Sequence, residues 1–221
     1  MEKIKILIAD DHAVVRDGTR QILEQEADMD VVAEAADGTE AIKLAGSSRP
    51  DVAIIDIAMP GVDGIEATKQ IKLLYPTIAV LILSAYDDDQ FVFSLLEAGA
   101  AGYLLKSIRG RELIEAVRQV HAGESVLHPS IARKVLNRFV PVSGKPAGQK
   151  PTEVLSDRET EVLKLATRGL SNQDIADELC LSLRTVQAHL GHIFNKLQVS
   201  SRTEAVVRAL KEGWVTLEDI P

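Results

Sequence analysis

Five apolar runs, separated by stretches with helical spacing, make up the first half of the chain and constrain its fold more than any other feature. The runs cover residues 4–10, 30–36, 51–57, 79–85 and 102–106 and are rich in Ile, Val and Leu with little polar alternation. Runs of this kind form strands that are buried on both faces. Their strict alternation with helices predicts an α/β fold, in which a doubly wound, five-stranded parallel sheet carries helices on both faces.

Polar residues at the ends of four of these runs suit phosphoryl transfer. Asp10 and Asp11 follow the first run, and Asp56, Ser84 and Lys106 lie at the ends of three others. Because parallel strands end along one edge of a sheet, where ligands bind, we expect these side chains to meet there. Asp56 is a suitable nucleophile towards phosphorus, and Lys106 and Ser84 would stabilise the phosphoryl oxygens. The acidic pair beside Asp56 requires a cation, and Mg²⁺ prefers such oxygen ligands.

The length of 221 residues predicts two domains. We place the first at residues 1–124, a linker at 125–150 and the second at 151–221. Residues 141–151 are rich in Pro, Gly and small polar residues, which is typical of a flexible linker. Residues 130–140 are compatible with a short basic helix.

The lack of a long apolar stretch limits where the protein can be located, and its single cysteine limits its redox chemistry. No apolar stretch approaches 18 residues and no charged-then-apolar segment begins the sequence, so we expect no membrane span and a cytoplasmic location. Cys180 is the one cysteine, which excludes an internal disulfide and a cysteine-based zinc site. We expect Cys180 to occupy an apolar core position of a helix.

The second domain carries the signals of a small helical bundle. Serines that precede acidic residues at capping-box spacing begin three helices, at positions 156, 171 and 201, and Ser182 is a plausible N-cap for a fourth. A short turn at 180–182 joins two helices with facing apolar residues, which is the pattern of a helix-turn-helix. Periodicity alone also fits a bundle with no role in DNA binding.

The motifs of the first domain resemble the receiver domain of two-component response regulators, which has a flavodoxin-like fold. The matching strings are Asp10-Asp11, Asp56-Ile-Ala-Met-Pro-Gly-Val-Asp-Gly64, Ser84-Ala85 and Gly102-Tyr-Leu-Leu-Lys106. The resemblance implies that Asp56 accepts a phosphoryl group from a sensor histidine kinase. It implies that Mg²⁺ is held by Asp11, Asp56 and the carbonyl of Ala58, with Asp10 acting mainly through water, and that Ser84 and Tyr103 form a switch pair.

Residues 155–210 resemble the LuxR-type helix-turn-helix, and its union with a receiver is the arrangement of the NarL/FixJ subfamily. The resemblance implies binding to promoter double-stranded DNA, dimerisation on phosphorylation and, as a further candidate partner, RNA polymerase. Four residues are expected to contact phosphates and four to lie near base edges or phosphates at the groove. The first set is Arg184, Thr185, Lys196 and Arg202; the second is Gln187, Ala188, His192 and the phosphate-facing His189. Pairing of Gln with adenine and of Ala with the thymine methyl group predicts a preference for A·T in each half-site.

The charge of the second domain departs from the family pattern. Residues 151–221 carry 8 Lys and Arg against 11 Asp and Glu, a net charge of −3, and Gln173 and Gln187 stand where the family commonly carries Lys. Each lost phosphate contact weakens DNA binding and its salt dependence. We therefore expect a single copy to bind poorly and two copies to bind together. The apolar stripe of the last helix, at Ala205, Val206, Ala209 and Leu210, is a plausible dimer surface, and it fits packing within its own bundle as well.

Two other functions fit parts of the chain. One is a phosphorelay in which the helical domain docks a protein, and the other is a DNA-binding regulator that ignores phosphorylation. The complete helix-turn-helix argues against the first, and the complete set of acids, hydroxyl and lysine argues against the second. In each case the chain is not a metabolic enzyme, because its chemistry is limited to its own phosphorylation and dephosphorylation with Mg²⁺.

Overall fold

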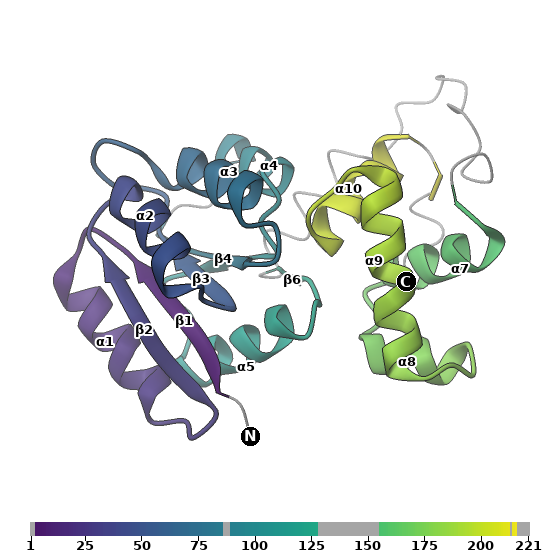
Figure 1. Cartoon of the computed structure of the whole chain (residues 1–221), viewed down its shortest axis with the longest axis horizontal. Coiled ribbons are helices and arrows are strands. Elements are labelled where there is room, and N and C mark those ends of the chain that lie inside the picture. Colours follow the sequence, from purple (N-terminus) through teal and green to yellow (C-terminus); the bar gives the residue numbers. More distant parts are fainter. Residues whose placement is uncertain (1–2, 86–88, 128–154, 213, 216–221) are drawn as a thin grey trace.

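The structure is a computed structural model that describes residues 3–85, 89–127, 155–212 and 214–215. A sheet with helices on both sides forms one part, and a bundle of helices lies beside it (Figure 1). The expected short helix at 130–140 and most of the expected linker lie outside the described residues. Within the described ranges, no helix is both long and apolar enough to span a membrane.

The sheet is parallel throughout and has the strand order β2-β1-β3-β4-β5-β6. The strands are β1 (Ile4–Ala9), β2 (Met29–Ala35), β3 (Val52–Ile55), β4 (Ala79–Ser84), β5 (Gly102–Leu105) and β6 (Val126–Leu127). The predicted doubly wound sheet is confirmed, but the count of five strands is wrong. Val126 and Leu127 pair with Gly102 and Tyr103 and add a short sixth strand at the edge, in a segment that we expected to begin the linker.

Helices cover both faces of the sheet, as the alternation predicted. They are α1 (Ala13–Glu24), α2 (Gly38–Ser48), α3 (Gly64–Leu74), α4 (Asp89–Glu97) and α5 (Gly110–His121). Successive residues of β1 point to opposite faces, so that Ile6 packs with Leu23 of α1 and Val117 of α5, whereas Leu7 packs with Ile71 of α3 and Leu95 of α4. The two apolar layers explain why the strands lack polar alternation.

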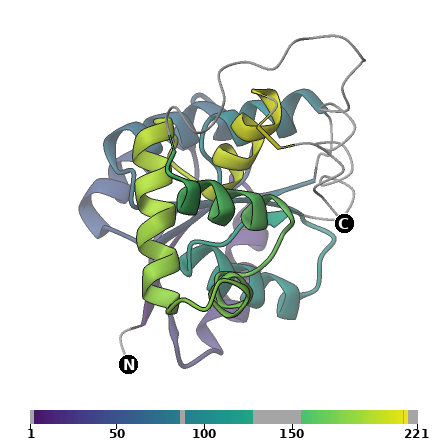
Figure 2. The ribbon, with the colours of Figure 1, turned by 90° about the vertical axis from the view of Figure 1, so that its right-hand side faces the viewer.

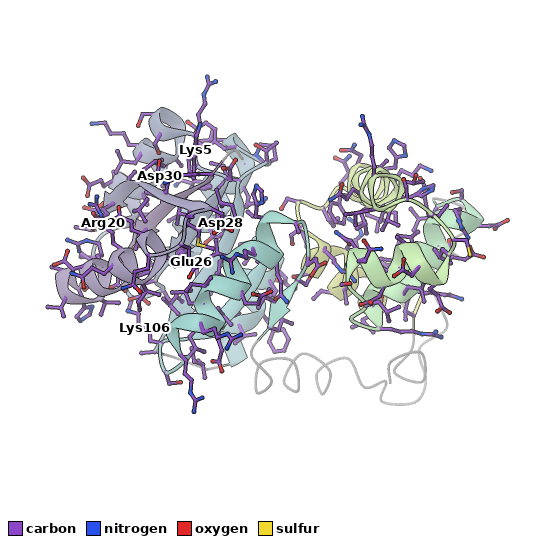
Figure 3. The ribbon with its side chains drawn as sticks, turned by 90° about the horizontal axis from the view of Figure 1, so that it is seen from below. Lys5, Arg20, Glu26, Asp28, Asp30 and Lys106 are labelled. Atoms are coloured by element: carbon purple, nitrogen blue, oxygen red, sulfur yellow. The ribbon has the colours of Figure 1, made fainter. Side chains whose placement is uncertain are left out.

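On the sheet face covered by α1 and α5, charged side chains at the surface join α5 to the segment that precedes β2. Arg118 of α5 donates hydrogen bonds to Glu26 at 2.7 Å and to Asp28 at 2.9 Å, across the entry to β2. In Figure 3, Arg20 lies on the side of the sheet-containing part that is away from the helical bundle, and Glu26 and Asp28 lie nearer its middle. The hydrogen bonds to Asp28 and Glu26 raise the pKa of Arg118, so it remains charged.

The bundle comprises α7 (Asp157–Thr167), α8 (Asn172–Glu178), α9 (Leu183–Leu197) and α10 (Arg202–Lys211). Each helix begins after a serine whose hydroxyl accepts a hydrogen bond from the backbone amide three residues later: Ser156, Ser171, Ser182 and Ser201. Ile175 and Ala176 of α8 pack against Val186, Leu190 and Ile193 of α9, which confirms the predicted facing of these two helices.

The expectation for Cys180 is wrong. It is exposed and has a φ of 52°, because α8 ends at Glu178 and the chain turns in the left-handed region before α9 begins. The helix therefore stops two residues before Cys180, and the helical spacing that placed Cys180 on an apolar face does not extend that far.

Candidate functional site

The adjacent strands β1 and β3 bring Asp10 and Asp56 together at the edge where the parallel strands end. The amide of Asp56 donates to the carbonyl of Ala9 at 2.8 Å, which places the two acids side by side. Asp10 is 4% exposed and Asp56 is 3% exposed, whereas Asp11 is exposed. Both buried carboxylates therefore need partners, since burial of an unpaired charge is costly.

Lys106, which follows β5, supplies the positive charge of the site. Its Nζ lies 2.7 Å from Oδ2 of Asp10 and 2.8 Å from Oδ2 of Asp56. Burial alone would lower the pKa of Lys106, but its hydrogen bonds to the two carboxylates and their charges outweigh burial and raise the pKa overall. The ammonium group thus stays charged beside the acid that the sequence predicts as nucleophile.

The loop after β3 holds Asp56 at the rim. Its Oδ1 accepts a hydrogen bond from the amide of Ile57 at 2.8 Å, and the amide of Gly64 donates to the carbonyl of Ile57 at 2.9 Å. A Cβ atom at Gly64 would lie 2.1 Å from the carbonyl oxygen of Asp56, so only glycine allows the chain to return this closely. Ala58, on the outer part of this loop, is exposed.

Ser84 and Tyr103 lie on the adjacent strands β4 and β5. Ser84 is fully buried at the end of β4, where its carbonyl accepts a hydrogen bond of 2.8 Å from the amide of Lys106. Tyr103 is fully buried in the middle of β5 and belongs to the apolar layer under α3 and α4. The structure therefore brings Ser84 to the same edge as the acids and Lys106, and places the Tyr103 ring inside the domain.

The donor set fits a hard divalent cation. Oxygen atoms of Asp10, Asp11 and Asp56 and a ring nitrogen of His12 all lie within 4.8 Å of one another. Three carboxylates against one ammonium leave a net charge of −2, which a divalent ion would balance. From the sequence we did not expect His12, which directly follows the acid pair, to be a metal ligand; in the structure its Nδ1 lies 2.6 Å from Oδ1 of Asp11.

The helix α9 presents most of the predicted DNA contacts to solvent. Arg184, Gln187, Ala188 and His192 are exposed, and Thr185 and His189 are half-buried. The hydroxyl groups of Thr185 and Ser182 lie 2.7 Å apart at the start of the helix. The polar face of α9 is thus continuous and open.

Lys196 and Arg202 differ from the other predicted phosphate contacts. Lys196 donates to the buried Glu159 of α7 at 2.7 Å while its side chain stays 44% exposed. Burial would raise the pKa of Glu159, but hydrogen bonds from Lys196 and Ser156 lower it to about 2. Lys196 therefore anchors α9 on α7 and still has an exposed side chain.

For Arg202 the prediction of a phosphate contact is wrong. Arg202 is 5% exposed and donates to Oδ1 of Asn172 at 2.9 Å and to the carbonyls of Ala166 and Leu170. Burial lowers its pKa to about 10. Its guanidinium group joins α10 to α7 and α8, a role that depends on contacts between distant segments and has no local sequence signal.

The family models match both parts of the chain. The model for the response regulator receiver domain matches residues 6–118, and the model for bacterial regulatory proteins of the luxR family matches residues 153–209.

Similar proteins cover almost the whole length. The oxygen regulatory protein NreC of Staphylococcus epidermidis is 44% identical over 95% of this chain and 98% of its own. The crystal structure of the response regulator ChrA of a heme-sensing two-component system has 40% identity and a TM-score of 0.53 and covers 97% of this chain and 100% of its own. A structure of RcsB dimers bound to DNA has 28% identity and a TM-score of 0.57 over 96% of this chain and 99% of its own.

Proposed function

Because the chain belongs to the two-component response regulators of the NarL/FixJ subfamily, transcription regulators with a receiver and a LuxR-type DNA-binding domain, we propose that Asp56 is its phosphorylation site. The observation that carries this proposal is the meeting of Asp56 with Asp10 and Lys106 at one edge of the sheet, with Nζ of Lys106 within 2.8 Å of both carboxylates. A sensor histidine kinase would be the phosphoryl donor.

The transfer follows from the geometry of Asp56. One carboxylate oxygen forms the new bond to phosphorus as the bond from phosphorus to the donor histidine nitrogen breaks, and the electron pair of that bond stays on the nitrogen. The ammonium group of Lys106, which pairs with Oδ2 of Asp56, would donate to the phosphoryl oxygens and balance their negative charge. Ser84 at the end of the neighbouring strand would donate its hydroxyl to another of these oxygens. Asp11, Asp56 and the carbonyl of Ala58 would hold Mg²⁺, with Asp10 acting through water; when bound, the ion supplies charge neutralisation.

Phosphorylation of Asp56 is tested directly. The purified chain is incubated with acetyl phosphate and Mg²⁺, and phosphoprotein is measured by mass spectrometry for wild type, Asp56→Ala and Asp63→Ala. Asp63 is a matched control because it is an exposed acid of the same loop whose carboxylate only caps α3. We expect an added phosphoryl group in wild type and Asp63→Ala and none in Asp56→Ala; equal labelling of all three would refute the site.

We further propose that two phosphorylated copies bind a two-fold promoter site through α9. The open polar face of α9 supports this, as does the similarity to RcsB, whose dimers bind DNA. The base-reading residues would be Gln187, Ala188 and His192, with Arg184, Thr185, His189 and Lys196 towards phosphates. Two copies double the contacts of a domain with a net charge of −3. We propose the cytoplasm as the location of the protein and RNA polymerase as a further candidate partner.

Selection of binding sites from random DNA duplexes tests the proposed DNA binding through α9. With phosphorylated protein we expect paired half-sites rich in A·T. Recovery of only G·C-rich half-sites would refute the assignment of Gln187 and Ala188 as base readers. Recovery of no sequence at all would favour the alternative, in which the helical domain docks a protein in a phosphorelay.

A further inference from the structure

His12 stands at the start of α1, but its side chain does not cap the helix. At this N-cap position Ser, Thr, Asp and Asn are preferred, because their oxygen atoms accept hydrogen bonds from the amides of the first turn. The imidazole of His12 makes no such bond. Its Nδ1 lies instead 2.6 Å from Oδ1 of Asp11 and 3.4 Å from Oδ1 of Asp10. The side chain therefore contacts the acids of the site rather than the helix.

The backbone around His12 is held by several hydrogen bonds. Its amide donates to Oδ1 of Asp10 at 2.9 Å, and its carbonyl accepts from the amides of Val15 at 3.0 Å and Arg16 at 3.1 Å. The guanidinium group of Arg16 also donates to the carbonyl of Asp10 at 2.6 Å. These bonds fix the turn from β1 to α1, so the imidazole can adjust to a ligand by rotation of its own side chain.

Lys106 and His12 contact different oxygen atoms of Asp10. Nζ of Lys106 lies 2.7 Å from Oδ2, whereas both the amide and the ring of His12 lie beside Oδ1. The ammonium group therefore occupies one side of the acid cluster. The other side is open to solvent, since the side chain of His12 is 66% exposed and that of Asp11 is 32% exposed.

The spacing of these donor atoms fits a single metal ion. Ligand atoms bound at right angles, each about 2.1 Å from the ion, lie about 3.0 Å apart. The separations of Nδ1 from the two carboxylate oxygens, 2.6 Å and 3.4 Å, bracket this value, and His12 and the three acids all offer donor atoms within 4.8 Å of one another. A hydrogen must lie between Nδ1 and Oδ1 of Asp11. An ion bound to both atoms would replace it, and the proton would leave to solvent.

The helical bundle lies away from this cluster. The helix α1 is at the end of the receiver that is far from the bundle (Figure 1), and in Figure 2 the bundle lies on the viewer's side of the receiver. The cluster consists of Asp10, Asp11, His12 and Asp56, which all belong to the receiver. Binding of an ion there does not need the second domain.

An imidazole nitrogen changes which ion such a site prefers. Mg²⁺ is a hard ion that takes oxygen ligands. Imidazole suits ions such as Fe²⁺, Co²⁺, Ni²⁺ and Zn²⁺, whereas carboxylate and water suit Mg²⁺. Three carboxylates with one imidazole are therefore a better donor set for a first-row transition ion than three carboxylates alone.

We propose that Nδ1 of His12 is a metal ligand of the receiver and that it gives the site a preference for a first-row transition ion, such as Co²⁺ or Zn²⁺, over Mg²⁺. The proposal rests on the proposed metal site of Asp11 and Asp56 and adds a nitrogen ligand to it. A transition ion would take the same position as Mg²⁺, so the two ions would compete for the receiver.

Binding of Co²⁺ and Mg²⁺ to the full chain, without a phosphoryl donor, tests the proposal. Calorimetry measures the affinity for Co²⁺, and the NMR shifts of the loop amides measure that for Mg²⁺, in wild type, His12→Asn and His121→Asn. Asparagine removes the imidazole and is itself favoured at the N-cap, so α1 should form as before. His121, an exposed histidine at the end of α5, is the matched control.

We expect His12→Asn to lower the affinity for Co²⁺ at least about tenfold, because one ligand is lost, and to change the affinity for Mg²⁺ by no more than about twofold. The His121→Asn variant should keep both affinities. An equal change for the two ions in His12→Asn, or no change for either, would overturn the proposal.

Proton NMR of the Co²⁺ form gives a readout that a merely structural role of His12 would not produce. The ring N–H of an imidazole bound directly to Co²⁺ gives a strongly shifted, exchangeable proton signal. We expect one such signal in wild type and His121→Asn that His12→Asn lacks. If wild type lacks it at saturating Co²⁺, His12 is not a ligand, and the proposed function still stands.

The variant Asp11→Asn separates this proposal from the proposed function on which it rests. Removal of a carboxylate ligand should weaken the binding of Mg²⁺ and of Co²⁺ alike. If it weakens neither, the proposed metal site itself fails, and the assignment of His12 fails with it.

Discussion

Lys106 shows how one side chain can set the charge of a site. It pairs with two buried carboxylates that come from different strands, and the pKa of Lys106 is raised despite its burial. Removal of the ammonium group leaves Asp10 and Asp56 next to each other with no compensating charge. Lys106 therefore stabilises the resting site, and under the proposed function it would also stabilise the transferred phosphoryl group.

Lys106→Met should lower the rate of phosphorylation by acetyl phosphate about 100-fold, because one preorganised charge near the reacting oxygens is lost. Time courses on gels that retard phosphoprotein would measure it. Lys69→Met, which removes an exposed lysine from α3, is the control and should leave the rate unchanged. A rate for Lys106→Met equal to that of the control would contradict the role.

Lys72, at the end of α3, makes the stability of the protein depend on pH. Burial lowers the pKa of Lys72 from 10.5 to about 8, although the nearby negative charge of Glu204 acts in the opposite direction. The Nζ of Lys72 donates hydrogen bonds to the carbonyls of Pro76 and Ile78. Because the folded state binds fewer protons than the unfolded state between these two values, the free energy of unfolding should rise with pH in that window.

The rise contributed by Lys72 should be about 2 to 3 kcal/mol between pH 8 and pH 10.5. Urea denaturation of wild type and Lys72→Met across this range isolates it, because all other groups titrate in both proteins. We expect the stability of wild type to gain on that of the variant as pH increases. Parallel pH profiles would contradict the lowered pKa.

At the scale of the element, two glycines differ in the space around them: Gly64 is tightly enclosed and Gly191 is not. A Cβ atom at Gly64, where α3 begins, would strike the backbone of Asp56 and Ile57, whereas one at Gly191, inside α9, would meet nothing within 4 Å. Backbone cannot move aside as a flexible side chain can, so the loop that carries Asp56 depends on its glycine. The helix α9 has no such need.

Gly64→Ala should destabilise the protein by about 2 to 3 kcal/mol through overpacking. Gly191→Ala should stabilise it by up to about 1 kcal/mol, because alanine is the better helix former. Chemical denaturation followed by circular dichroism measures both. Changes of the same sign for the two variants would show that the close approach at Gly64 does not limit the fold.

At the scale of the whole molecule, charge is distributed unevenly. Residues 1–124 carry 12 Lys and Arg against 22 Asp and Glu, a net charge of −10; residues 125–150 carry +5 and the helical domain carries −3, which gives −8 overall. A DNA-binding protein with this balance gains little from general attraction to phosphates and depends on specific contacts and on pairing. Gln173 and Gln187 of the helical domain are both exposed and uncharged.

Gln173→Lys with Gln187→Lys should raise affinity for DNA and steepen the slope of log affinity against log salt by about 1.8, that is about 0.9 for each phosphate contacted. A salt titration of binding by anisotropy measures the slope. Gln21→Lys with Gln25→Lys adds the same charge on and directly after α1 of the receiver, where both residues are exposed, and serves as control. Equal slopes for the two double variants would mean that positions 173 and 187 do not face the phosphates.

The sequence alone determined the order of the elements, the doubly wound sheet, the serine caps of the bundle and the polar residues that end β1, β3, β4 and β5. These features depend on local preference, on periodicity and on the rule that parallel strands end along one edge, all of which can be read without knowing distant contacts. Only the tertiary structure decided that β6 extends the sheet, that Cys180 is exposed, that Arg202 is buried, and that His12 joins Asp56 in one cluster. Each of these depends on which surfaces of distant segments come together, because burial and hydrogen-bond satisfaction are properties of the assembled molecule and not of any one segment.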